Sequence, residues 1–171
     1  MISFGVAPGI LLYQFTKYLN TVNEVQILTD YPWLFYIAFI IPVYSSFRLA
    51  KFNIDTRQTD SFIGLPTPAN ASFFLFVVIL YFHPDLPKLI NLNSFVMPVI
   101  GNPLIMLGFG VIFSILLVAE IPMFSLKFKN MKWKDNKLPF TFMLLWFFLF
   151  LTTNLFAMSS IVILYILVSI F

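Results

Sequence analysis

The sequence predicts an all-α protein whose helices form a polytopic transmembrane bundle. Of its 171 residues, 60% are hydrophobic and 10% are charged, whereas about a quarter of the residues in an ordinary soluble domain are charged. A soluble domain of this length buries only about 70% of its chain surface, so its 23 phenylalanines would leave large apolar patches in water. Helices are expected because backbone groups in lipid must bond within their own segment, and the alternation typical of barrel strands is missing.

About six stretches approach the length of a spanning helix, which is about 20 residues for roughly 30 Å of hydrocarbon. They are residues 2–19, 31–50, 66–82, 99–121, 138–156 and 158–171. The third and the last are the shortest. The polar connections between them are residues 20–30, 52–65, 83–98 and 127–137. We expect the whole chain, residues 1–171, to form a single transmembrane domain.

The basic residues predict the orientation. Eight of the ten lie near two alternate connections: Arg48, Lys51, Arg57, Lys127, Lys129, Lys132, Lys134 and Lys137. The other two basic residues, Lys17 and Lys88, lie near the connections on the opposite side of the membrane. Because Lys and Arg accumulate in cytoplasmic loops, both basic connections and both chain ends should be cytoplasmic. The lysines of residues 127–137 also suit an anchor beside anionic lipid.

The end of the second stretch contains the strongest candidate binding residues. At about 100° per residue, Arg48 and Lys51 share one face of the helix, and Phe47 lies on another. Two readings stay open. The cations can be topology anchors whose heads reach water, or they can line a cavity for phosphate or carboxylate, for which an arginine fork is well shaped.

A second candidate follows in the chain, where Gly64 and Pro66 precede the third stretch. A turn and a helix start explain much of this segment, since proline is favoured in the first turn of a helix. The proline pair at 66 and 68 would also hold the loop near the cytoplasmic opening. No phosphate-binding glycine loop, zinc signature or nucleophile elbow is present in the sequence, cysteine is absent, and we expect no nucleic-acid partner.

Three segments resemble bacterial phosphatidylserine synthases, which belong to the CDP-alcohol phosphatidyltransferase family. They are residues 3–9 (SFGVAPG), 47–53 (FRLAKFN) and 62–68 (FIGLPTP). Their order and approximate spacing match those enzymes, so the resemblance is specific over about the first 70 residues. The later stretches resemble the family only in hydropathy.

The family's aspartate signature does not occur in this sequence. It reads D-G-x-x-A-R, then eight residues, then G-x-x-x-D-x-x-x-D, and in the family it supplies the ligands of a divalent cation and the base. In the relatives, its final aspartate lies directly before the segment that matches residues 1–9. We therefore expect a chain that lacks the first spans of the enzyme, and Met1 would be an internal methionine.

The resemblance implies transfer of a phosphatidyl group from CDP-diacylglycerol to L-serine, with release of CMP, on the cytoplasmic side of the bacterial inner membrane. It implies Mg²⁺ or Mn²⁺ as cofactor, although its ligands, and with them the catalytic residues, lie outside this sequence. For this chain it implies substrate contacts at Arg48, Lys51 and Asn53. The helix and loop around them would be shaped by Gly5, Pro8, Gly64 and Pro66. The chain alone should be inactive.

Two other functions remain open. One is a related transferase with another acceptor, such as glycerol phosphate or inositol phosphate, although the FRLAKFN segment favours serine. The other is a non-catalytic membrane remnant or subunit, which the missing aspartates would suit. A homodimer is compatible with the sequence, which does not determine the oligomeric state, the acyl-chain preference or the source organism.

Overall fold

The computed structural model describes residues 1–54, 62–84, 92–123 and 136–170, and these residues are mainly helical. The predicted all-α class is confirmed. The helices are the π-helical turn η1 (Ile2–Val6), α1 (Ala7–Asn23), α2 (Gln26–Asp30), the 3-10 helix η2 (Pro32–Phe39), α3 (Ile40–Ile54), α4 (Thr67–Phe82), α5 (Asn93–Ile100), α6 (Pro103–Val118), α7 (Lys137–Thr153) and α8 (Leu155–Ile170). Two short strands, β1 (Phe62–Ile63) and β2 (Pro122–Met123), pair antiparallel. The segments 55–61, which contains Arg57, and 124–135, which contains four of the lysines, lie outside the described residues.

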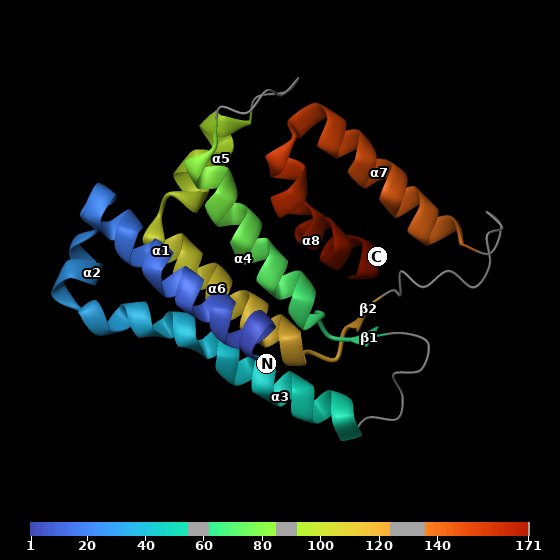
Figure 1. The fold of residues 1–171 in the computed structure, drawn as a ribbon, viewed down its shortest axis with the longest axis horizontal. Helices are drawn as coiled ribbons and strands as arrows, with labels where there is room; N and C mark the ends of the chain where they lie inside the picture. The colour runs from blue at the N-terminus through green and yellow to red at the C-terminus, as the bar shows by residue number, and fades with distance from the viewer. Residues whose placement is uncertain (55–61, 85–91, 124–135, 171) are drawn as a thin grey trace.

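The six apolar stretches correspond to α1, α3, α4, α6, α7 and α8, and successive members of this set run in opposite directions (Figure 1). The amino ends of α1 and α4 and the carboxyl ends of α3 and α6 therefore meet at the end of the bundle that holds β1 and β2 (Figure 1). We call this the β end. Helices α2 and α5 lie at the opposite end.

Aromatic packing joins the helices of the core. Phe73 of α4 stacks on Phe113 of α6 with ring centroids 4.2 Å apart, and Phe74 meets the same ring edge-on at 5.9 Å. Helix α4 also packs along α8, which forms a hairpin with α7. The hairpin thereby covers the side of α4 that faces away from α1.

Helix lengths do not by themselves establish six crossings. In the described part of the chain, Pro32–Ile54 is long and apolar enough to cross a bilayer. Helices α5 and α6 would together make a second span, but they are bent by 79°. Helix α4 and the stretches Pro139–Thr153 and Leu155–Ser169 are apolar but shorter.

Two boundaries predicted from the sequence were wrong. The expected loop 83–98 contains the start of α5 at Asn93, and the expected stretch 99–121 is divided between α5 and α6. The division lies at Asn102, whose side-chain oxygen accepts from the Leu104 amide at 2.9 Å and caps α6. Because Pro103 then occupies the first helical position, a new helix begins there.

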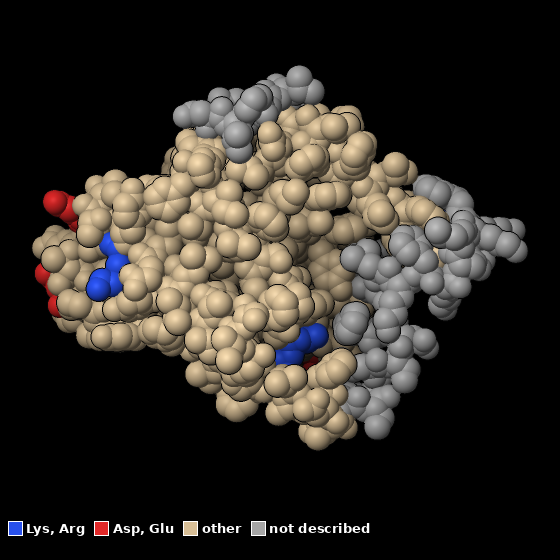
Figure 2. Space-filling view, viewed as in Figure 1, with Lys and Arg blue, Asp and Glu red and all other residues tan. Residues whose placement is uncertain are grey.

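Many apolar side chains are exposed in the described part of the chain, and the buried face of α3 includes the polar residues Ser45 and Arg48. Phe47 is 60% exposed and Arg48, its neighbour in the chain, is 8% exposed. Figure 2 shows one face of the molecule, on which charged side chains gather at two separated places with a broad uncharged area between them. At the two neighbouring positions Phe47 and Arg48, the usual arrangement of a water-soluble protein, with apolar side chains inward and arginine outward, is inverted.

A cavity at Arg48

Arg48 connects three segments at the β end. Its Nη1 atom donates to the carbonyl oxygen of Ile63 at 2.8 Å and to that of Leu117 at 2.9 Å. The first acceptor lies in β1 and the second in the last turn of α6. Charge-assisted hydrogen bonds are about twice as strong as neutral ones, so Arg48 holds α3, β1 and α6 together.

The carboxyl end of α6 explains why a cation lies here. The last carbonyls of a helix have no amide partner within it, and the helix dipole makes this end partly negative. The carbonyl oxygens of residues 116–118 are all bonded to neighbouring segments. Their donors are the Leu65 amide at 2.9 Å, Arg48 at 2.9 Å and the Lys51 ammonium at 3.3 Å.

Gly64 makes the close approach of β1 possible. Its φ of +76° lies in the left-handed region, and a Cβ there would stand 2.8 Å from the carbonyl oxygens of Leu117 and Ala119. The same Cβ would stand 3.0 Å from Arg48 Nη1. Only glycine therefore fits this turn without displacing the arginine.

Gly5 and Gly9 have the corresponding role at the amino end of α1. They are four residues apart and face α3, where a Cβ on Gly5 would meet Ser45 Cβ at 3.0 Å and one on Gly9 would meet Pro42 Cδ at 2.8 Å. Small residues at this spacing let two helices approach closely. The contact places Ser45 and the following turn of α3 beside the amino end of the chain.

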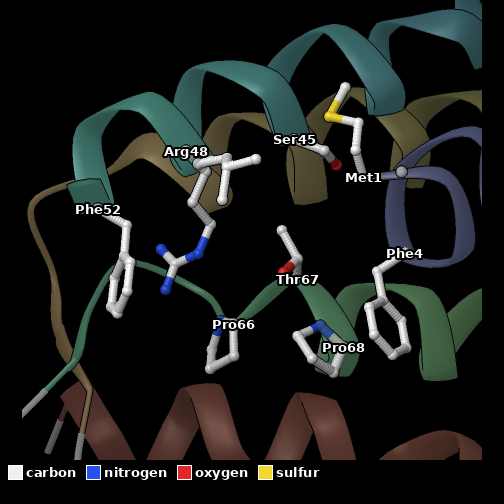
Figure 3. Close-up of a pocket in the computed structure, with 10 residues that line it drawn as sticks. Met1, Phe4, Ser45, Arg48, Phe52, Pro66, Thr67 and Pro68 are labelled. Atoms are coloured by element: carbon white, nitrogen blue, oxygen red, sulfur yellow. The ribbon is translucent and has the colours of Figure 1, made fainter.

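A cavity of about 320 Å³ lies in front of Arg48. The Arg48 guanidinium, Ser45 and Thr67 project into it, and Phe4, Phe52 and Pro66 form its walls (Figure 3). The remaining lining residues are Met1, Gly5, Leu49 and Pro68. The cavity thus has a few polar groups in an apolar wall, as ligand sites typically do.

These polar groups have bonding capacity to spare. Among the described residues, no carboxylate pairs with Arg48, and its Nε and Nη2 groups donate to no protein atom. Ser45 is 3% exposed, and its hydroxyl has no hydrogen-bond partner among the residues that the structure describes. A buried hydroxyl without a partner and a buried cation without a counter-charge are unfavourable, and an anion in the cavity would complement both.

The structure brings some of the predicted binding residues together and separates others. Arg48, Gly5 and Pro66 line the cavity, and Gly64 contacts Arg48 from behind. Pro8 is buried in α1 outside the lining.

Two further predicted residues lie apart from the cavity wall. Lys51 forms an ion pair with Glu120 at 3.1 Å. As predicted, it lies on the same face of α3 as Arg48, because the two side chains bond the carbonyl oxygens of consecutive residues of α6, Val118 and Leu117. Asn53 is exposed on the last turn of α3 and has no hydrogen bond to a described residue.

Ser45 and Thr67 were missed by sequence reasoning. Ser45 precedes Arg48 by three residues, so helical periodicity places it on the same face, and this signal was available. Thr67 was hidden because it lies in the segment interpreted as a turn. Its approach to Ser45 depends on the β1–β2 pairing, for which two residues per strand leave no recognisable pattern.

The divalent cation implied by the resemblance does not fit the described residues. No three Asp, Glu, His or Cys side chains within them lie close enough to hold a metal ion. Glu120 is 68% exposed and engaged in an ion pair with Lys51. The described part of the chain therefore has a cavity lined by a cation but no cluster of metal-ligating side chains.

Comparison with known proteins supports the resemblance. The chain is 31% identical over 135 residues to a CDP-diacylglycerol–serine O-phosphatidyltransferase of Helicobacter pylori strain J99, an alignment that covers 78% of this chain and 47% of that protein. It is 38% identical over 82 residues to the protein of the same name from a second Helicobacter pylori strain, covering 47% of this chain and 30% of that protein. No family model matches the chain, and no solved structure matches it.

The chain spans about half the length of the first of these relatives. An alignment of 135 residues extends well beyond the first 70 residues, on which the three segments lie. The resemblance to bacterial phosphatidylserine synthases is thereby confirmed. It also extends, in sequence identity, to later helices for which the sequence analysis recognised only a similar hydropathy.

Proposed function

We propose that this chain is the substrate-binding part of a phosphatidylserine synthase, which transfers a phosphatidyl group from CDP-diacylglycerol to L-serine and releases CMP. One observation carries the proposal. Arg48 is a buried cation that has no carboxylate partner among the described residues and projects into a cavity. The substrates of this reaction bear phosphate and carboxylate groups, which match a guanidinium fork.

The cavity defines what this chain's residues do in the reaction. Arg48 is held by Ile63 and Leu117 through Nη1, so its other N–H groups are pre-oriented toward the cavity. They bind a phosphate or the serine carboxylate, and the hydroxyls of Ser45 and Thr67 donate to the same anion. Phe4 and Phe52 exclude water and strengthen these interactions. Lys51 and Asn53, at the same helix end, are proposed to meet the more exposed part of the substrate.

The base and the divalent cation, Mg²⁺ or Mn²⁺, are proposed to come from outside this sequence. In the family, an aspartate precedes the segment matched by residues 1–9, and Met1 lies in the wall of the Arg48 cavity. An acidic side chain at that place would reach the same space. The described residues themselves perform no step through the metal.

We propose a multi-pass protein of the bacterial inner membrane, with α1, α3, α4, α6, α7 and α8 as six crossings and the β end in the cytoplasm. Alternating helix directions, outward-facing apolar side chains and uncharged helix centres support it. Arg48 and Lys51 lie near the carboxyl end of α3, and the lysine-rich segment 124–135 follows β2 in the chain, so these cations belong to the β end. Helices α4 and α6, with 16 residues each, and α1 and α7, with 17 each, are slightly short for a crossing, which a thinner bilayer or flanking residues can accommodate.

The experiment joins the upstream segment of the Helicobacter pylori J99 relative to Met1 of this chain and measures CMP release in membranes. We expect turnover that requires both CDP-diacylglycerol and L-serine. Turnover with glycerol phosphate or inositol phosphate instead of serine would contradict the serine acceptor. A joined protein that inserts into membranes but neither turns over nor is thermally stabilised by CDP-diacylglycerol would contradict the proposal as a whole.

A further inference from the structure

A cavity of about 880 Å³ lies at the end of the bundle opposite the β end. The carboxyl ends of α1 and α4 lie there beside the bend between α5 and α6 (Figure 1). The Asn23 side chain of α1 donates to the carbonyl oxygen of Gly101 at 2.7 Å and fixes the bend to α1. We call this space the α5 cavity. Its volume lies within the usual range for small-molecule sites, about 300 to 1,000 Å³.

Three aromatic rings that contact one another line the α5 cavity. Tyr18 meets Tyr81 edge-on with ring centroids 6.3 Å apart. The ring centroid of Phe82 lies 5.2 Å from that of Tyr18 and 5.5 Å from that of Tyr81. Tyr18 is 44% exposed and Phe82 is 50% exposed, so the core does not cover their rings. Because the face of an aromatic ring is electron-rich, such a cluster attracts an ammonium group.

The charges around the cavity also favour a cation. In the described part of the chain, no Lys or Arg lines it. The ammonium of Lys17 lies 5.3 Å from the centroid of the Tyr13 ring, outside the lining. The exposed carboxylate of Glu24 lies in the chain between Asn23 and Val25, which both line the cavity. The cavity at the β end has the opposite character, because a guanidinium lies in its wall.

Hydrogen-bond donors in the same lining have capacity to spare. The hydroxyls of Tyr18 and Tyr81 and the side-chain nitrogen of Asn102 donate to no described atom. The side-chain oxygen of Asn102 is fixed by the amides of Leu104 and Ile105 at 2.9 and 3.3 Å. Hydroxyl and amide groups of this kind can donate to phosphate oxygens. The lining therefore suits a molecule that carries a phosphate close to an ammonium.

The position of the α5 cavity favours a lipid as the source of these groups. It lies where α1 and α4 end, and tyrosine is enriched at the level of lipid headgroups. We propose that the cavity binds the headgroup of a zwitterionic phospholipid, with the ammonium on the rings of Tyr18, Tyr81 and Phe82 and the phosphate at Asn102. The inference goes beyond the proposed function, since it involves neither the Arg48 cavity nor the reaction.

The test compares phosphatidylethanolamine with phosphatidylglycerol of the same acyl chains, which share the phosphate and differ in the ammonium. The purified chain in detergent receives an equimolar mixture, and native mass spectrometry measures the ratio of the two singly bound forms. The wild-type ratio should favour phosphatidylethanolamine about 3- to 10-fold. Tyr18→Leu removes one ring and should lower the ratio toward one. Tyr18→Phe keeps the ring and should keep the preference.

Tyr36→Leu is the matched control, because Tyr36 is an exposed tyrosine of η2 outside the cavity, and it should keep the wild-type ratio. The ratio is internal to each variant, so a partly unfolded preparation does not alter it. Equal amounts of the two lipids on wild type would overturn the proposal. So would a preference that Tyr18→Leu leaves unchanged, or one that Tyr36→Leu lowers as much as Tyr18→Leu does.

A competition separates a lipid from a soluble ligand of the same chemistry. Glycerophosphoethanolamine carries the phosphate and the ammonium without acyl chains, and a tenfold excess of it should leave phosphatidylethanolamine bound. Displacement of the lipid under these conditions would overturn the assignment to a lipid and identify the α5 cavity as a site for a soluble ligand.

Discussion

The Arg48 guanidinium donates to the Leu117 carbonyl at 2.9 Å, across 69 positions of the sequence. This bond makes the arginine both a cap for α6 and a wall of the cavity. Arg48 can therefore stabilise the fold and bind a ligand at the same time. Its Nη1 group bonds the protein carbonyls, and its other N–H groups face the cavity. The predictions below separate these two contributions.

Gly64→Ala should destabilise the protein. A side chain at φ +76° is strained by about 1–2 kcal/mol, and its Cβ would stand 2.8 Å from two carbonyl oxygens. Gly108→Ala is the matched control, since a Cβ there would meet no described atom within 4 Å apart from its own stretch of helix and alanine favours a helix by up to about 1 kcal/mol. Thermal unfolding in detergent should show a lower midpoint for Gly64→Ala than for wild type. A midpoint unchanged from wild type would contradict the described turn.

Glu120→Gln should change stability by less than about 1 kcal/mol. The side chains of Lys51 and Glu120 are 35% and 68% exposed, and ion pairs exposed to solvent contribute little. Lys51 would keep its bond to the Val118 carbonyl. Thermal unfolding of wild type and Glu120→Gln at low and high salt measures the contribution of this ion pair to stability. If Glu120→Gln lost several kcal/mol of stability, the ion pair would contribute far more than its exposure indicates.

The β end should be cytoplasmic. Since the chain has no cysteine, single cysteines at Lys137 and at Asp30 report opposite ends of the bundle without background. A membrane-impermeant maleimide applied to spheroplasts should label Asp30→Cys and leave Lys137→Cys unmodified until the membrane is opened. The reverse pattern would invert the proposed orientation.

By itself, the chain should not release CMP from CDP-diacylglycerol, with or without serine and Mg²⁺ or Mn²⁺. The described residues hold no group of acids that could bind the cation. Turnover above a matched membrane blank would show that the acids lie within this sequence after all. Membranes that contain the Helicobacter pylori relative are the positive control.

The sequence predicted much of this arrangement because its signals were local. Hydropathy placed α4 almost to the residue, and helical periodicity put Arg48 and Lys51 on one face of α3. Long-range contacts could not be predicted in this way. The Arg48 acceptors are backbone carbonyls, which every residue has, and the β1–β2 pair is too short for a recognisable pattern. Likewise, the bend at Gly101 and Asn102 depends on a cap inside an apolar stretch that hydropathy treats as continuous.

Kinetics of Arg48→Lys in the joined protein test the central claim most directly. Lysine can still donate to the carbonyls of Ile63 and Leu117, but it loses the fork that faces the cavity. If Arg48 binds substrate, catalytic efficiency with CDP-diacylglycerol and serine should fall about 10- to 150-fold while the unfolding midpoint stays close to that of wild type. Wild-type efficiency in Arg48→Lys, at matched expression, would contradict the account and leave Arg48 as a cap of α6 alone.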